Sequence, residues 1–155
     1  MTDIGFYHLR TMPLDRALPK ILESALAQGH RVVVMAGSSE RVDHLDALLW
    51  TYNEASFLPH GTARDGHADR QPIWLTAEDE NPNRATLVVL VDGAATAHLA
   101  SYARCADIFD GSDDQAVAAA RARWQAAKAA GHRLTYWEQT AKGWENRGST
   151  QAEER

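Results

Sequence analysis

Apolar residues follow two different periods along the first third of the chain. Residues Asp3–Leu9 have a period of two, which predicts a strand. Its faces are Ile4, Phe6 and His8 on one side and Gly5, Tyr7 and Leu9 on the other. A helical period follows, and Gly29 is a natural stop for the helix. The apolar positions of that helix are Leu14, Ala17, Leu18, Ile21, Leu22, Ala25 and Leu26. Arg31–Ala36 is then almost continuously apolar, which is typical of a strand buried on both faces.

The middle of the chain predicts a second helix among shorter segments. A turn at Gly37–Glu40 precedes this helix, either Ser38 or Ser39 is its N-cap, and it runs to about Trp50. The shorter segments are a strand at Ser56–Pro59, a polar surface loop at His60–Gln71, a strand at Pro72–Thr76 and a turn at Asn81–Asn83.

The second half of the chain contains the most regular helical pattern. Residues Ala116–Ala130 include nine alanines in fifteen positions, which favours a helix, and Gly131 ends it. The other elements are a buried strand at Ala85–Val91, a strand at Ala103–Phe109 that carries Arg104 and Asp107, and an extended segment at Leu134–Trp137.

Strands that alternate with helices predict an α/β fold in three layers. We expect a Rossmann-like arrangement, with a mostly parallel sheet covered by helices on both faces and with right-handed crossovers. The length of 155 residues fits one domain. We assign residues 1–147 to that domain and expect Gly148–Arg155 to be a disordered tail.

Composition excludes several classes of protein. Apolar residues make up 45% of the chain and charged residues 24%, which is ordinary for a globular protein. Cys105 is the only cysteine, so an internal disulfide and a Cys-x-x-Cys zinc site are both impossible, and we expect a cytoplasmic location. The N-terminal sequence has no basic segment followed by an apolar run, so it is not a signal peptide. The apolar runs are too short to cross a membrane.

Charge is distributed unevenly along the sequence. The formal net charge is -5, yet Gln115–Arg133 contains four basic residues and no acidic one, so the rest of the chain carries -9. A small basic patch on an acidic body suits an anionic peptide better than duplex DNA, since non-specific DNA affinity needs many clustered cations. We therefore expect contact with DNA to be indirect.

Within this basic segment, one helical stripe combines charge with an aromatic ring. Val117, Arg121, Trp124 and Lys128 are spaced by four, three and four residues, which places them on one side of a helix. A guanidinium beside an indole can bind a carboxylate and stack a ring. The alternative is a solvated basic helix with Trp124 in the core.

A second group of aromatic residues follows the second predicted helix. Trp50, Tyr52 and Phe57 lie within eight residues of one another. Large aromatic side chains at the end of an element can anchor a partner protein. They can equally close the core of a small domain, and the spacing does not separate these alternatives.

The sequence contains no complete catalytic or metal-binding motif. The turn at Gly37–Ser39 follows a strand and opens a helix, as phosphate-binding turns do, but neither a dinucleotide fingerprint nor a P-loop motif is present. Asp92 follows a predicted strand, where α/β enzymes place active groups. A small nucleotide- or phosphate-binding enzyme that uses this turn and Asp92 is the alternative function. The remaining polar clusters, Asp43, His44 and Asp46, and His60, Asp65 and His67, match no metal site, and we expect no metal or cofactor.

Several segments resemble the chi subunit of bacterial DNA polymerase III holoenzyme, from near the N-terminus to about Trp144. The segments are Ile4–Leu9, Asp46–Trp50, Ser56–Gly61, Asp107–Gly111, Ala120–Trp124, Ala130–His132 and Tyr136–Trp137. Their order and spacing make the match specific. The resemblance implies an α/β subunit without catalytic activity that links the polymerase or clamp loader to the acidic C-terminal tail of the single-stranded-DNA-binding protein.

The resemblance also implies roles for individual residues. Arg121 would bind the terminal carboxylate of that tail and Trp124 would flank its terminal ring, while Lys128 and Arg123 would attract the acidic residues upstream. Some relatives carry a basic residue where this chain has Val117, which implies either weaker attraction of those acids or compensation by Arg123 and Arg133.

Trp50 and Phe57 match aromatic residues that contact the small partner subunit psi in relatives of this family. The same surface, with Tyr52 beside it, is equally suited to a helicase-type partner. The resemblance thus implies psi as second partner, with a helicase-type protein as the alternative.

Overall fold

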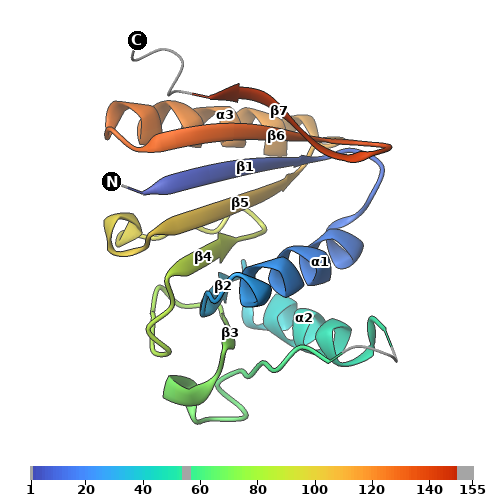
Figure 1. The fold of residues 1–155 in the computed structure, drawn as a ribbon, viewed down its shortest axis with the longest axis vertical. Coiled ribbons are helices and arrows are strands. Elements are labelled where there is room, and N and C mark those ends of the chain that lie inside the picture. The colour runs from blue at the N-terminus through green and yellow to red at the C-terminus, as the bar shows by residue number, and fades with distance from the viewer. Residues whose placement is uncertain (1, 54–56, 150–155) are drawn as a thin grey trace.

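The computed structural model describes residues 2–53 and 57–149, which form a seven-stranded sheet with helices on both faces (Figure 1). The strands are β1 (Asp3–Leu9), β2 (Val32–Met35), β3 (Ile73–Thr76), β4 (Leu87–Leu90), β5 (Arg104–Asp110), β6 (Arg133–Thr140) and β7 (Gly143–Ser149). The helices are α1 (Leu14–Ala27), α2 (Ser39–Thr51) and α3 (Asp114–Ala129), with short 3₁₀ turns at Ala68–Arg70 and Leu99–Ser101. The strand order is β3-β2-β4-β5-β1-β6-β7, and only β6 and β7 pair antiparallel.

The direction of each crossover decides which face its helix covers. The chain moves from β1 to β2 and from β2 to β3 toward one edge of the sheet, whereas it moves from β5 to β6 toward the other edge. Because crossovers between parallel strands are right-handed, α1 and α2 pack on one face and α3 packs on the opposite face (Figure 1). The predicted three-layer α/β fold is confirmed.

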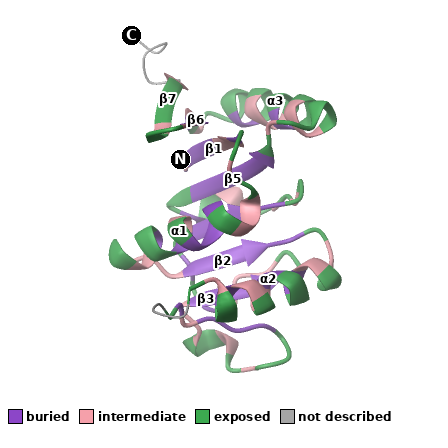
Figure 2. Cartoon of the chain, turned by 90° about the vertical axis from the view of Figure 1, so that its right-hand side faces the viewer, coloured by how far each residue is buried: buried purple, intermediate pink, exposed green. Residues whose placement is uncertain are grey.

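Each face of the sheet has its own apolar core. Leu18, Leu22 and Leu45 are fully buried on the face of α1 and α2, where they pack with alternate residues of the central strands. The α3 face contains Phe6 and Leu134. Strand β2 is buried along its whole length, and β5 is buried except at its first and last residues, as the purple ribbon in Figure 2 shows. The continuous apolar runs from which the sequence predicts the central strands therefore reflect burial on both faces of the sheet.

Two predicted segments differ from the structure at the β3 edge. The strand expected at Ser56–Pro59 is wrong for residues 57–59, which have no regular structure, and Ser56 lies outside the described residues. The chain instead meets β3 just afterwards, where the Gly61 N–H donates to the Ile73 carbonyl at 3.0 Å. For the same reason His60–Gln71 is not a surface loop throughout, since its first three residues are buried.

The C-terminal end of the domain differs as well. The antiparallel strand β7 is absent from the sequence prediction, and it includes Gly148 and Ser149, which we assigned to a tail. Residues 150–155 of that expected tail lie outside the described part of the chain. Among the helices described, none is long and apolar enough to span a membrane.

Candidate functional site

Helix α3 carries the predicted basic stripe, and the side chains that it packs against the sheet are alanines. At its N-terminus, the Asp113 carboxylate accepts the second and third backbone N–H groups of the helix at 2.9 and 3.3 Å. Ala120 and Ala127 are buried against the sheet. Because these side chains are small, the helix lies close to the strands, and the larger side chains beside them enclose a space.

That space is a cavity of about 220 Å³ between α3 and the sheet, which we call the aromatic cavity. Its lining residues are Phe6, Phe109 and Tyr136 from the strands, and Val117, Ala120, Arg121, Trp124 and Gln125 from the helix. The Trp124 ring meets Phe6 at 5.3 Å and Tyr136 at 6.0 Å between centroids, edge to face in both cases. Such pairs are favourable geometries for aromatic rings, so the rings form firm walls.

His8 supports two of these walls from behind. Its Nδ1 atom is hydrogen-bonded to the Tyr136 hydroxyl, and its ring lies 5.2 Å from that of Phe109. Burial lowers the pKa of His8, and the positive charge of Arg121 lowers it further. Burial also raises the pKa of Tyr136. Both groups are thus held neutral beside the cavity near neutral pH.

Arg121 is exposed at the rim of the aromatic cavity. Within residues 2–53 and 57–149, no carboxylate lies within ion-pair distance of its guanidinium. Its charge nevertheless affects the pKa values of His8 and Tyr136, which places it beside the aromatic walls. The arrangement combines an apolar recess for one ring with a cation at its mouth.

The other residues predicted for this surface have different places. Val117 lines the aromatic cavity, so its side chain contributes an apolar wall. Lys128 is exposed one helical turn beyond Trp124, outside the lining. Arg123 lies elsewhere, because its Nε and Nη2 atoms donate to the two carboxylate oxygens of Asp107 at 2.6 and 2.9 Å. Asp107 is buried in β5, so this pair fastens the helix to the sheet and neutralises Arg123.

The predicted partner surface contains the two large apolar side chains that are most exposed in the described chain. Trp50 is 57% exposed and Phe57 is 66% exposed, with ring centroids 5.8 Å apart. We call them the Trp50–Phe57 patch. His60 lies beneath Trp50 at 4.9 Å between centroids, and its Nε2 atom is 3.0 Å from Asp46 Oδ1. The exposed Trp50 ring of the patch therefore rests on the buried His60 side chain and its contact with Asp46.

Tyr52 is separate from that patch. Its hydroxyl donates to Glu23 Oε1 at 2.5 Å, and its ring packs against the core on the α1 face. Of the three aromatic residues predicted as partner anchors, Trp50 and Phe57 are exposed, whereas Tyr52 packs against the core.

The turn considered for phosphate binding is filled by protein groups. Asp92 Oδ2 accepts the Gly37 N–H and the Arg41 Nε–H, both at 3.1 Å. The Ser38 hydroxyl accepts the Arg41 N–H at 3.2 Å and caps α2. An internal carboxylate thus takes the place at the helix N-terminus that a phosphate would need.

The polar clusters of the sequence are divided into separate pairs. His44 contacts Asp15 at 2.9 Å, Arg64 contacts Asp43 at 3.3 Å, and Asp65 accepts from the Thr62 N–H. In the part of the chain that the structure describes, no three His, Cys, Asp or Glu side chains form a group that could hold a metal ion.

The strand residues of the site were missing from the sequence prediction, namely Phe6, His8, Phe109 and Tyr136. The period of two in the first strand places Phe6 and His8 on one face, and this is the signal that could have found them. Phe109 and Tyr136 lie on strands from other parts of the sequence, and only the strand order brings them to the same helix.

Comparison with known proteins gives a family. Residues 1–135 match the family model described as DNA polymerase III chi subunit, HolC. A curated relative from Rickettsia prowazekii (strain Madrid E), named probable DNA polymerase III subunit chi, is 29% identical over 91 residues, which cover 59% of this chain and 55% of the relative. The aligned part thus spans about half the length of that relative. Because the family model covers most of the sequence, the chain belongs to the DNA polymerase III chi subunit family.

Proposed function

We propose that this chain is a non-catalytic adaptor in DNA replication that binds the acidic C-terminal tail of the single-stranded-DNA-binding protein in the aromatic cavity. Membership of the chi family supports a role in the polymerase III complex. One structural observation supports the tail as ligand: Arg121 stands without a carboxylate partner among the described residues, at the rim of a cavity with aromatic walls.

The chemistry of the cavity matches a chain terminus that carries both a ring and a carboxylate. A terminal aromatic side chain would enter the cavity and pack against the rings of Trp124 and Tyr136, which both line it. The terminal carboxylate would then meet Arg121, whose planar guanidinium can donate two parallel hydrogen bonds. The volume of about 220 Å³ admits a single ring rather than a folded segment.

The acidic residues upstream of the terminus would be attracted by Lys128, which is exposed beyond Trp124. Val117 contributes contact with the ring instead of charge. Arg123 has no role in binding in this proposal, because Asp107 neutralises its charge. The affinity should therefore depend on one strong carboxylate contact and one weaker, salt-sensitive attraction.

The Trp50–Phe57 patch is the proposed surface for a second partner that connects the chain to the clamp loader or to a helicase. Two adjoining exposed rings are suited to a groove on a partner protein, since aromatic side chains anchor many interfaces. In this proposal psi, or a helicase-type protein in its place, occupies that patch, and DNA is reached through the single-stranded-DNA-binding protein.

A calorimetric titration with an acidic peptide that ends in Pro-Phe tests the tail site. We expect a dissociation constant on the order of micromolar that rises with salt. Arg121→Ala should weaken binding by about tenfold or more, and so should amidation of the peptide terminus, because each removes one side of the carboxylate contact. Arg64→Ala is the matched control, since Arg64 is an exposed arginine paired with Asp43. Unchanged binding in Arg121→Ala and Trp124→Ala would place the tail elsewhere.

A further inference from the structure

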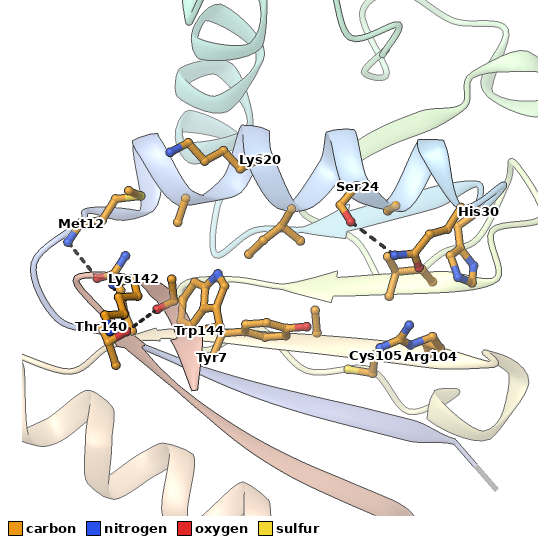
Figure 3. A pocket seen from close by; sticks show the side chains of 18 of the residues that line it. Tyr7, Met12, Lys20, Ser24, His30, Arg104, Cys105, Thr140, Lys142 and Trp144 are labelled. Carbon is orange, nitrogen blue, oxygen red and sulfur yellow. Dashed lines mark hydrogen bonds between the residues drawn. The ribbon is translucent and has the colours of Figure 1, made fainter. Parts of the chain in front are cut away.

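A second, larger cavity lies on the other face of the sheet, between α1 and the β6–β7 hairpin (Figure 3). Its volume is about 570 Å³, which is in the usual range for ligand sites. We call it the hairpin cavity. It shares no lining residue with the aromatic cavity, so the two can be tested independently.

The floor of the hairpin cavity is an aromatic surface that depends on a glycine. A Cβ atom at Gly5 would lie 2.8 Å from Tyr7 Cε1, so the missing side chain gives the Tyr7 ring its place over the strand. Trp144 meets that ring edge-on at 5.1 Å between centroids. The Tyr7 hydroxyl makes no hydrogen bond to another described residue, so it is available to donate to a ligand acceptor.

The hairpin wall is fixed in place by one side chain. Gln139 Oε1 accepts the backbone N–H groups of Arg10, Thr11 and Met12 at 2.9, 3.0 and 2.8 Å. These three bonds tie β6 to the connection between β1 and α1. The wall residues, Gln139 to Trp144, follow the end of the family match at residue 135, so this part of the cavity lies outside the matched region.

Positive charge stands at both ends of the hairpin cavity. Lys20 on α1 and Lys142 on the hairpin lie toward one end of the cavity, and Arg104 lies toward the other (Figure 3). Among the described residues, no aspartate or glutamate lines the cavity, although the whole chain has a net charge of -5. Apolar side chains also line the cavity, among them Ile21, Ala25, Ala106 and Trp144, together with polar ones such as Ser24 and Gln139.

We propose that the hairpin cavity binds a short acidic segment of a partner protein in which two carboxylates flank an apolar side chain. One carboxylate would pair with Lys20 and Lys142, and the other with Arg104 and the Tyr7 hydroxyl. A mononucleotide carries its charge at one end only, and a nucleic-acid strand needs a longer track of cations than three residues provide. Charge at two ends around an apolar centre therefore favours a peptide.

The length of the cavity sets the spacing of the two acids. Along α1 and its C-cap the lining runs from Ala17 to Gln28, and the part from the cation Lys20 to Gln28 is about 12 Å long at the helical rise. Glutamates four residues apart in an extended chain are about 13 Å apart. The probe is therefore acetyl-Glu-Ala-Leu-Ala-Glu-amide. Both of its ends are blocked, so it lacks the terminal carboxylate that the aromatic cavity requires.

The test is a titration of the full chain followed by nitrogen–proton correlation spectra, with the Trp144 indole signal identified by Trp144→Phe. We expect a saturable shift with a dissociation constant on the order of 0.1–1 mM. Lys142→Glu should weaken binding about tenfold or more, since it reverses one charge. Tyr7→Phe should weaken it less. Arg16→Glu is the matched charge reversal, on α1 but outside the lining.

Three results would overturn this proposal. The first is the absence of a saturable shift up to about 10 mM peptide, or an equal shift from the peptide with glutamine in place of both glutamates. The second is loss of binding in Arg121→Ala, which would mean that the peptide occupies the aromatic cavity. The third is a lower dissociation constant for an oligothymidine or for adenosine monophosphate than for the peptide, measured on the Trp144 signal. That result would assign the cavity to nucleotides.

Discussion

The aromatic cavity and the Trp50–Phe57 patch use the same kind of side chain in opposite ways. In the aromatic cavity, Trp124 is half-buried and faces other rings across a small recess. In the patch, Trp50 and Phe57 are 57% and 66% exposed. The cavity also has an arginine at its rim, whereas the groups beneath Trp50 are a histidine and an aspartate that contact each other.

This difference indicates what each surface can recognise. A recess with one cation selects a small group that has a ring and an anionic end, so its specificity comes from a terminus. A protruding pair of rings has to enter a groove on another protein, so its specificity depends mainly on the shape of that partner. The two surfaces are thus suited to different partners, in keeping with the adaptor role that we propose.

The largest expected contrast is the effect of removing each tryptophan on folding. Trp124→Ala should lower the free energy of unfolding by about 3 kcal/mol, since it empties a packed site between α3 and the sheet. Trp50→Ala should change it by less than about 0.5 kcal/mol, because the ring is mostly in solvent. Urea unfolding of the two variants measures both values, and equal losses would mean that the patch is part of the core.

The next effect concerns Arg123, which the sequence predicts at the binding surface and which instead pairs with Asp107. Asp107→Asn should destabilise the protein by about 2 kcal/mol, because it leaves the partly buried Arg123 without its carboxylate. Tail affinity, measured under conditions in which the variant is folded, should stay within about twofold of the parent protein. A large gain in affinity would show that a released Arg123 can reach the tail.

The sequence predicts this site only in part, and the reason is physical. Helical spacing places Arg121 and Trp124 on one stripe, because that relation is local. The same spacing cannot show that Asp107, sixteen residues earlier, neutralises Arg123. Strand β7 was missed because its burial pattern is mostly polar and exposed, so no apolar period marks it.

The fold is predictable where burial is strong. The central strands and the alanine-rich helix have patterns that few other structures can satisfy, and they were found from the sequence. The edge of the sheet near β3 was not predicted correctly. The chain there pairs with β3 through a single backbone bridge at Gly61, and such a bridge imposes no pattern on the side chains.

A smaller effect is the pH dependence that His8 confers on the aromatic cavity. The charged groups that influence its pKa are Glu138, Arg10, Arg121 and Asp110. Burial depresses the pKa in the folded state, so below the ordinary value of about 6.5 the unfolded chain binds more protons than the folded one. Stability from this residue is therefore complete above that pH and is lost as the pH falls toward the folded pKa.

Thermal melts at several pH values between about 7.5 and 5 test this dependence. His8→Gln should reduce the fall of the melting temperature on acidification, even if the variant is less stable throughout. Trp50→Ala provides the comparison, since Trp50 is on α2, on the face of the sheet opposite to α3, and the variant should retain the slope of the parent protein. The same slope in all three proteins would assign the pH dependence to other groups.

The smallest expected effect separates Tyr52 from its aromatic neighbours. Tyr52→Phe removes the hydroxyl that donates to Glu23 but keeps the ring that packs against the core. Because that hydrogen bond is exposed, the free energy of unfolding should fall by no more than about 0.5 kcal/mol. Binding of the second partner should be unchanged in this variant and reduced in Phe57→Ala, and a pull-down of the partner compares them. A loss of partner binding in Tyr52→Phe equal to that in Phe57→Ala would extend the Trp50–Phe57 patch to Tyr52, and the contact with Glu23 would then belong to the interface rather than to the core.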